Sequence, residues 1–185
     1  EQIGKLDVKK EARTATVRMN VINNYQNVVN NVSILGRIPT AGNKHADTLE
    51  DFYSNLTSTL SSAIGVNGMN AEVYYSTNPS ATKDINLEAN AWTKTPENLA
   101  NIKSYLIVLT GNMATGTILE VSYGLTIPEN VAYNTQAYSD YVVYFDNVKQ
   151  EGTISEKVVA TKVGLESGDG PELEVSIHSD MEGKE

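Results

Sequence analysis

The sequence predicts an all-β domain, an antiparallel β-sandwich with long loops, and three observations lead to this fold class. Apolar and polar residues alternate along most segments of strand length, which is the period of a chain with one buried face and one wet face. The 10 tyrosines, beside only 2 phenylalanines, and the abundant Thr, Val and Asn favour sheets joined by Asn and Gly turns. A pair of strands cannot cover its own apolar face, so a second sheet must pack against the first.

The clearest stretch is 102–128, which we expect to form strand, turn and strand. The first arm, 102–109, is apolar at both parities near its end, which is typical of a central strand. In the second arm, one face of the strand is apolar and the other is polar or small. The apolar face carries Leu119, Val121, Tyr123, Leu125 and Ile127.

Three strands are expected near the start of the chain. Residues 5–10 alternate over a short segment, and 15–22 place Ala15, Val17, Met19 and Val21 inward. Residues 28–38 follow after an Asn-rich turn, until Pro39 ends the ladder. We expect the second and third of these strands to form a hairpin.

The middle of the chain is richer in loops. Residues 40–47 are a polar loop that carries His45, and 48–64 combine helical spacing of apolar residues with many Ser and Thr, which favours an extended or irregular segment. A strand is expected at 71–76. Residues 77–101 are a long polar excursion, and we expect Trp92 to pin it.

Two further strands are expected at 138–145 and 156–165, before a Gly- and Pro-containing boundary at 167–171. Beyond it, residues 172–175 echo residues 5–8. We therefore divide the chain into a domain at 1–168 and a segment at 169–185, a linker plus the first strand of a possible following repeat. The alternative is that the last strand joins the same sheet.

Charge and composition exclude several function classes. The net charge of -9 repels the phosphates of nucleic acids and anionic lipids, so we expect no nucleic-acid partner. The absence of cysteine excludes disulfides, thiolate metal sites and thiol nucleophiles. No apolar run reaches the length of a membrane span, so we expect no membrane insertion.

Several phrases in the chain are similar to phrases that recur in one kind of protein. They are residues 17–24, 31–34 with 38–39, 73–78, 116–117 with Tyr123 and 127–128, and 162–165 through 170–171. These phrases resemble the immunoglobulin-like repeats of Gram-positive cell-surface and adhesin-like proteins.

The resemblance implies an immunoglobulin-like sandwich in an extracellular protein at the cell surface or cell wall. It also implies a non-catalytic structural and interaction module, an adhesin or stalk repeat, with no catalytic residues to carry over. Neighbouring repeats in the same chain, and a host or matrix protein or glycan, are the partners that it implies.

The residues themselves indicate no enzyme and no cofactor. His45 and His178 are the only histidines, and no motif supports a catalytic triad or a zinc site around them. Glu50-Asp51, Asp146, Asp169 and Glu172 could offer oxygen ligands to calcium. Because no loop has the repeating acidic spacing of a dedicated site, solvated acidic loops are the default interpretation.

Two special roles stay open. Lys103 or Lys162 could form a Lys-Asn amide crosslink with Asn20 or Asn147 near an acid such as Asp140, although outward-pointing lysines that protect sheet edges are the default. The alternative function is a carbohydrate- or protein-ligand-binding module that uses the excursion and nearby aromatic residues. The aromatic candidates are Trp92, Tyr74, Tyr105 and Tyr138, with Tyr144 beside them; the default is half-buried packing.

Overall fold

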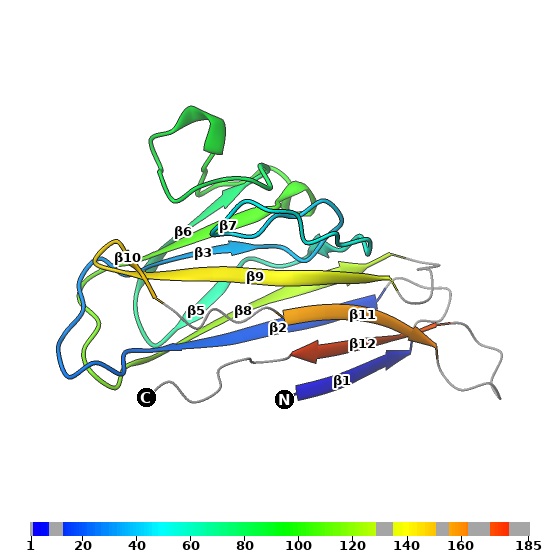
Figure 1. The fold of residues 1–185 in the computed structure, drawn as a ribbon, viewed down its shortest axis with the longest axis horizontal. Helices are drawn as coiled ribbons and strands as arrows, with labels where there is room; N and C mark the ends of the chain where they lie inside the picture. The colour runs from blue at the N-terminus through cyan, green and yellow to red at the C-terminus, as the bar shows by residue number, and fades with distance from the viewer. Residues whose placement is uncertain (1, 8–12, 129–134, 151–155, 163–170, 178–185) are drawn as a thin grey trace.

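The computed structural model describes residues 2–7, 13–128, 135–150, 156–162 and 171–177. It confirms the all-β fold class, with two antiparallel sheets that pack as a sandwich (Figure 1). The larger sheet has the order β1-β12-β11-β9-β3-β7-β6, with β10 paired to β9, and the smaller sheet has the order β2-β8-β4, with β5 also paired to β8. The strands are β1 Gln2–Asp7, β2 Arg13–Ile22, β3 Ser33–Arg37, β4 Thr59–Leu60, β5 Gly65–Asn67, β6 Ala71–Ser76, β7 Ser104–Leu109, β8 Ile118–Ile127, β9 Gln136–Phe145, β10 Val148–Lys149, β11 Glu156–Lys162 and β12 Pro171–Ile177.

The smaller sheet is built on a ten-residue ladder between β2 and β8, from Arg13 opposite Ile127 to Ile22 opposite Ile118. The alternation expected from the sequence decides which face is buried, because every second side chain points into the space between the sheets. The buried side chains of this face are Val17, Met19, Val21, Leu119, Val121, Tyr123, Leu125 and Ile127.

Two expected hairpins are wrong. β7 pairs with β3 and β6, whereas β8 pairs with β2, β4 and β5, so the stretch 102–128 crosses from one sheet to the other. β2 and β3 also lie in different sheets. Tyr105 of β7 and Tyr123 of β8 meet across the core with ring centroids 5.6 Å apart. The alternation of apolar and polar residues shows which face of a strand is buried, but not which strand pairs with it. Two strands that face each other across the core therefore have the same sequence pattern as two strands that pair in one sheet.

The other segments agree more closely with expectation. β6 has the expected bounds, and residues 48–64 are extended or irregular apart from the two-residue β4. The last strand, β12, pairs with β1 and with β11 in this chain, which is the alternative stated above to a strand of a following copy. His178 and Asp169 lie outside the described residues.

Four strands of the larger sheet, β9, β3, β7 and β6, bury side chains on both faces. Their inner face packs against β2 and β8, and their outer face lies under the loop at 38–58 and the excursion at 77–101, which rises above β6 and β7 in Figure 1. The excursion contains two short 3-10 turns, Glu88–Asn90 and Leu99–Asn101. The second, outer hydrophobic cluster consists of Leu35, Ala46, Leu106 and Val142, with Tyr74, Trp92, Val108 and Tyr144 half-buried against it.

Candidate functional site

Four buried polar side chains form a row across the outer face of the larger sheet. Ser76 of β6 lies opposite Ser104 of β7, Ser104 lies opposite Arg37 of β3, and Arg37 lies opposite Asp140 of β9. Cross-strand partners project from the same face of a sheet, so the four side chains are neighbours. Their exposed fractions are 0% for Ser76, Ser104 and Arg37 and 5% for Asp140. We call these residues the polar row.

Three members of the polar row bind the main chain of the covering loops. Ser76 Oγ donates to the carbonyl oxygen of Asn90 at 2.5 Å, and Ser104 Oγ donates to that of Asn78 at 2.7 Å. On the other side, the amide of Ala46 donates to Asp140 Oδ2 at 2.9 Å. A buried polar group costs free energy unless it has a partner, and here the loop backbone is that partner. The polar row therefore fastens both loops to the sheet.

Arg37 is the least satisfied member of the polar row. Its Nη1 donates to Ser104 Oγ at 2.8 Å, but Nε and Nη2 are buried and have no hydrogen-bond partner among the described residues. Burial lowers the pKa of Arg37 to about 10, and the negative charge of Asp140 opposes this shift. At neutral pH the guanidinium is still cationic, so the sheet holds a buried positive charge that is only partly compensated.

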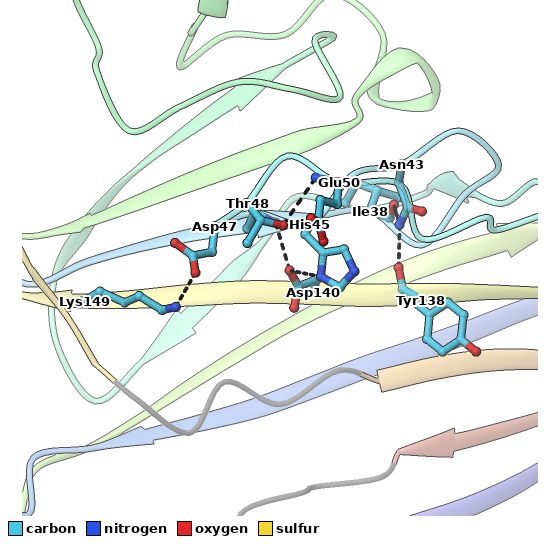
Figure 2. Close-up of polar contacts among 10 residues, drawn as sticks. Ile38, Asn43, His45, Asp47, Thr48, Glu50, Tyr138, Asp140 and Lys149 are labelled. Atoms are coloured by element: carbon cyan, nitrogen blue, oxygen red, sulfur yellow. Dashed lines mark hydrogen bonds and ion pairs between the residues drawn. The ribbon is translucent and has the colours of Figure 1, made fainter.

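The carboxylate of Asp140 lies between a loop amide and a histidine ring. Burial raises the pKa of Asp140, and the amide of Ala46 and the charges of His45 and Arg37 oppose that shift. His45 Nδ1 lies 4.0 Å from Asp140 Oδ2. Figure 2 shows the imidazole ring next to the carboxylate. The imidazole is about a third exposed, so this contact connects a buried acid to solvent.

The loop that carries His45 is held by an aromatic stack and by polar contacts. The rings of His45 and Phe52 stack with centroids 3.6 Å apart, and Phe52 stacks on Tyr138 at 5.3 Å. Asn43 Nδ2 donates to the carbonyl oxygen of Tyr138 at 2.5 Å (Figure 2). Lys149 of β10 forms an ion pair with Asp47 of this loop. The contacts around His45 therefore fix the position of the loop on β9.

The geometry around His45 and Asp140 resembles two-thirds of a catalytic triad, in which an acid orients a histidine. A nucleophile would have to hydrogen-bond the histidine. Among the described residues, no hydroxyl group donates to the His45 ring, and the nearby Thr48 Oγ1 accepts from the amide of Glu50 instead. In the same part of the chain, no three His, Asp or Glu side chains form a group that could hold a metal ion.

The four aromatic residues predicted to bind a ligand lie in separate places. Tyr74 and Trp92 pack half-buried on the outer cluster, and Tyr138 lies in the stack with Phe52 and His45. Tyr105 faces the inner core with an exposed fraction of 0%, and its hydroxyl contacts Met19 Sδ at 3.7 Å. The structure therefore brings Tyr74 and Trp92 to one cluster but places Tyr105 on the opposite face of the sheet.

Within the excursion, Trp92 and Asn90 hold the chain together. Trp92 Nε1 donates to the carbonyl oxygen of Thr82 at 2.8 Å, which agrees with the expected pinning role. Asn90, only 2% exposed, donates to the carbonyl oxygens of Thr82 and Asp84 and accepts from the amide of Thr82. Sequence reasoning missed Asn90 and the polar row. The available signal was the presence of Arg37 and Asp140 inside strand-prone apolar segments.

The residues considered for the crosslink are not joined in the described part of the chain. Lys103 is half-buried, and its main chain hydrogen-bonds the main chain of Ser76 and Ile38. Asn147 Oδ1 instead accepts a hydrogen bond from Lys83 Nζ at 2.9 Å, and Asn20 is exposed. The side chain of Lys162 lies outside the described residues, so the crosslink stays a prediction.

Comparison with known proteins adds no family. A scan against protein-family models finds no match for this chain, and a search of the curated proteins finds none either. The resemblance to Gram-positive surface repeats therefore stays a prediction from the sequence. In the described ranges, no helix has the length and apolar character needed to cross a membrane.

Proposed function

We propose that this chain is a non-catalytic structural and interaction module of a bacterial extracellular surface protein. In this proposal the sandwich is an immunoglobulin-like bead of an adhesin or stalk, exposed at the cell surface or cell wall. Its partners are neighbouring beads and a host or matrix protein or glycan. The strand layers supply rigidity, and the covering loops present the contact surface.

The observation that supports this proposal most is the use made of the polar row. In a catalytic site, convergent polar groups face a cleft that leaves space for a substrate. Here Ser76, Ser104 and Asp140 form hydrogen bonds with the main chain of the two covering loops. Side chains used in this way stabilise a shape rather than a transition state.

Localisation is the direct test. Antibodies against the purified chain should label intact cells of the bacterium that produces it, without permeabilisation. Labelling that requires permeabilisation would contradict the extracellular assignment. The non-catalytic assignment is tested separately with ester, glycan and peptide substrates. Turnover that disappears in both His45→Ala and Asp140→Asn would overturn it, because these two residues form the only triad-like contact described above.

The alternative is a ligand-binding module that uses the excursion around Trp92. One observation favours a limited version of it, since Tyr74 and Trp92 are partly exposed on the same outer cluster. Lys94 Nζ lies 5.3 Å from the centroid of the Tyr74 ring and bonds Glu72 at 2.8 Å, so polar groups border the aromatic pair. Binding of a glycan array that is lost in Trp92→Ala while the fold is retained would support this alternative.

A further inference from the structure

The covering loops hide only part of the outer face of the larger sheet. Cross-strand neighbours on this face form rows, and the polar row is the first of them. Two positions closer to the β10 turn, a second row carries Leu106, Leu35 and Val142, each 1% exposed. After two more positions, a third row crosses five strands and remains partly exposed. It consists of Glu72 of β6, Val108 of β7, Ser33 of β3, Tyr144 of β9 and Lys149 of β10. We call it the open row.

The middle of the open row is largely apolar and accessible. Val108, Ser33 and Tyr144 are half-buried, whereas Glu72 and Lys149, at the ends of the row, are exposed. Val108 and Tyr144 pack against the outer hydrophobic cluster and keep part of their surface in contact with solvent. Ser33 lies between them and has a short side chain. The open row therefore offers an apolar floor that belongs to the strands themselves.

An ion pair stands at each end of the open row. At the β6 end, Lys94 Nζ of the excursion lies 2.8 Å from Glu72 Oε1. At the β10 end, Asp47 of the loop at 38–58 pairs with Lys149 (Figure 2). These four side chains are 36–51% exposed, so part of their hydrogen-bonding capacity faces solvent. Because each charge is paired, the ends of the row offer directed donors and acceptors with little net charge.

Aromatic rings and lysines connect the open row to the excursion. Lys83 Nζ lies 4.8 Å from the centroid of the Tyr144 ring. Lys94 Nζ lies 5.3 Å from the centroid of the Tyr74 ring, which belongs to the second row. Trp92 is half-buried against the same outer cluster as both tyrosines. A ring with an ammonium group beside it combines apolar surface with hydrogen-bond donors, so the border of the open row is amphipathic.

The dimensions of the open row limit what it can bind. Neighbouring strands are about 4.8 Å apart, so a row across five strands is about 19 Å long, and successive rows are about 7 Å apart. The area is therefore on the order of 130 Å², far below the roughly 800 Å² that each partner buries in a stable protein–protein interface. A folded protein would need a much larger contact, whereas a short linear ligand that crosses the strands fits the open row.

We infer that the open row binds an uncharged oligosaccharide that lies across β6, β7, β3, β9 and β10. The inference rests on the proposed function and names its glycan contact. Sugar rings carry apolar C–H faces, which match Val108 and Tyr144, and hydroxyl groups, which match the paired charges at the two ends. The net charge of -9 opposes an acidic ligand, and the paired ends provide no excess of acid for a basic one. Because the floor belongs to the sheet, this site differs from the alternative site on the excursion.

Tryptophan fluorescence tests the inference, because Trp92 is the only tryptophan of the chain and packs on the cluster that carries the open row. The full chain is titrated with uncharged tetrasaccharides of glucose, mannose, galactose or N-acetylglucosamine. Tetragalacturonic acid is the acidic probe. We expect a saturable change in emission with at least one uncharged probe and a Kd of about 0.1–1 mM.

Two serine variants place the ligand on the sheet. Ser33→Gln puts a longer side chain on the floor of the open row, so it should weaken binding at least about tenfold. Ser122→Gln is the matched control, because Ser122 is also a half-buried strand serine but lies on the outer face of the smaller sheet. It should change the Kd by less than about twofold.

Three results would overturn the inference. They are the absence of saturable binding for every uncharged probe up to about 10 mM, tighter binding of tetragalacturonic acid than of the uncharged probes, and a Ser33→Gln variant that binds as well as the natural chain. Circular dichroism checks each variant for folding, and Lys149→Ala, at the exposed end of the open row, replaces Ser33→Gln if that variant does not fold. If no probe binds while antibodies still label intact cells, only the ligand assignment is wrong and the proposed function stands.

Discussion

Replacing Arg37 with methionine should stabilise the protein, although it removes a hydrogen bond. Burial lowers the pKa of Arg37 from its ordinary value to about 10, and at about 1.4 kcal/mol per pKa unit this corresponds to roughly 3 kcal/mol of unfavourable free energy for the buried charge. The lost bond from Nη1 to Ser104 costs about 2 kcal/mol. Methionine fills much of the same space, so little cavity remains. We expect a net gain of about 1 kcal/mol in the free energy of unfolding.

Urea denaturation at pH 7 measures this difference, since the midpoint shifts while the slope stays constant. In a thermal scan the same gain raises Tm by about 2–4 °C. Arg18→Met is the matched control, because Arg18 is an exposed strand residue and its replacement should change stability by less than about 0.5 kcal/mol. Arg37→Ala should instead destabilise by about 2 kcal/mol or more, because it leaves a cavity.

A loss of more than about 1 kcal/mol in Arg37→Met would refute this reasoning. It would mean that Nε and Nη2, which have no partner among the described residues, are satisfied in solution by water or an anion. The water or anion would then compensate more of the positive charge of Arg37 than the described protein contacts do. Comparison of the variant in chloride and in sulfate would separate an anion from water, because only a bound anion makes the loss depend on the salt.

Three other outcomes follow from the same structure. The pKa of Asp140 is raised in the folded state, so the folded protein retains a proton that the unfolded chain has lost, and stability falls as pH rises from about 3.8 through the raised pKa. Asp140→Asn should remove this dependence on pH. Urea titrations between about pH 3.5 and 7 measure the difference in the free energy of unfolding between this variant and the natural protein, and a difference that stays constant would contradict the prediction. Trp92→Ala should lower the free energy of unfolding by about 2 kcal/mol and leave the circular dichroism spectrum unchanged. Tyr105→Ala should lower it by about 3–5 kcal/mol, because Tyr105 is fully buried in the inner core. Equal losses in the two variants would contradict the separation of the inner and outer clusters. The intact mass should equal that of the plain sequence, and a lower mass would reveal a crosslink at Lys103 or Lys162.

Local pattern was sufficient to predict strands but not their neighbours. β6 and the buried face of β8 follow directly from alternation, because side-chain direction has a period of two in any extended segment. The pairing of β7 with β3, and of β8 with β2, depends on contacts between residues far apart in the chain. Nothing in the segment 102–128 distinguishes a hairpin from a crossover between sheets.

The candidate site was even less accessible to sequence reasoning. Arg37 and Asp140 are about a hundred positions apart, and only strand register makes them neighbours. The left-handed backbone at Leu49 and Tyr53 was also hidden, because that conformation is normally indicated by Gly or Asn. Trp92 was foreseen as the residue that pins the excursion because a lone large ring in a polar segment needs a packing surface.

The fastening of the loops has an evolutionary consequence. Ser76 and Ser104 donate to main-chain carbonyl oxygens, and Asp140 accepts from a main-chain amide, so each tie is indifferent to the identity of the residue it holds. A point substitution at the half-buried Asn78 that preserves the backbone path would leave its attachment to Ser104 intact. Evolution can therefore change the side chains that the covering loops expose while the larger sheet beneath them keeps its structure.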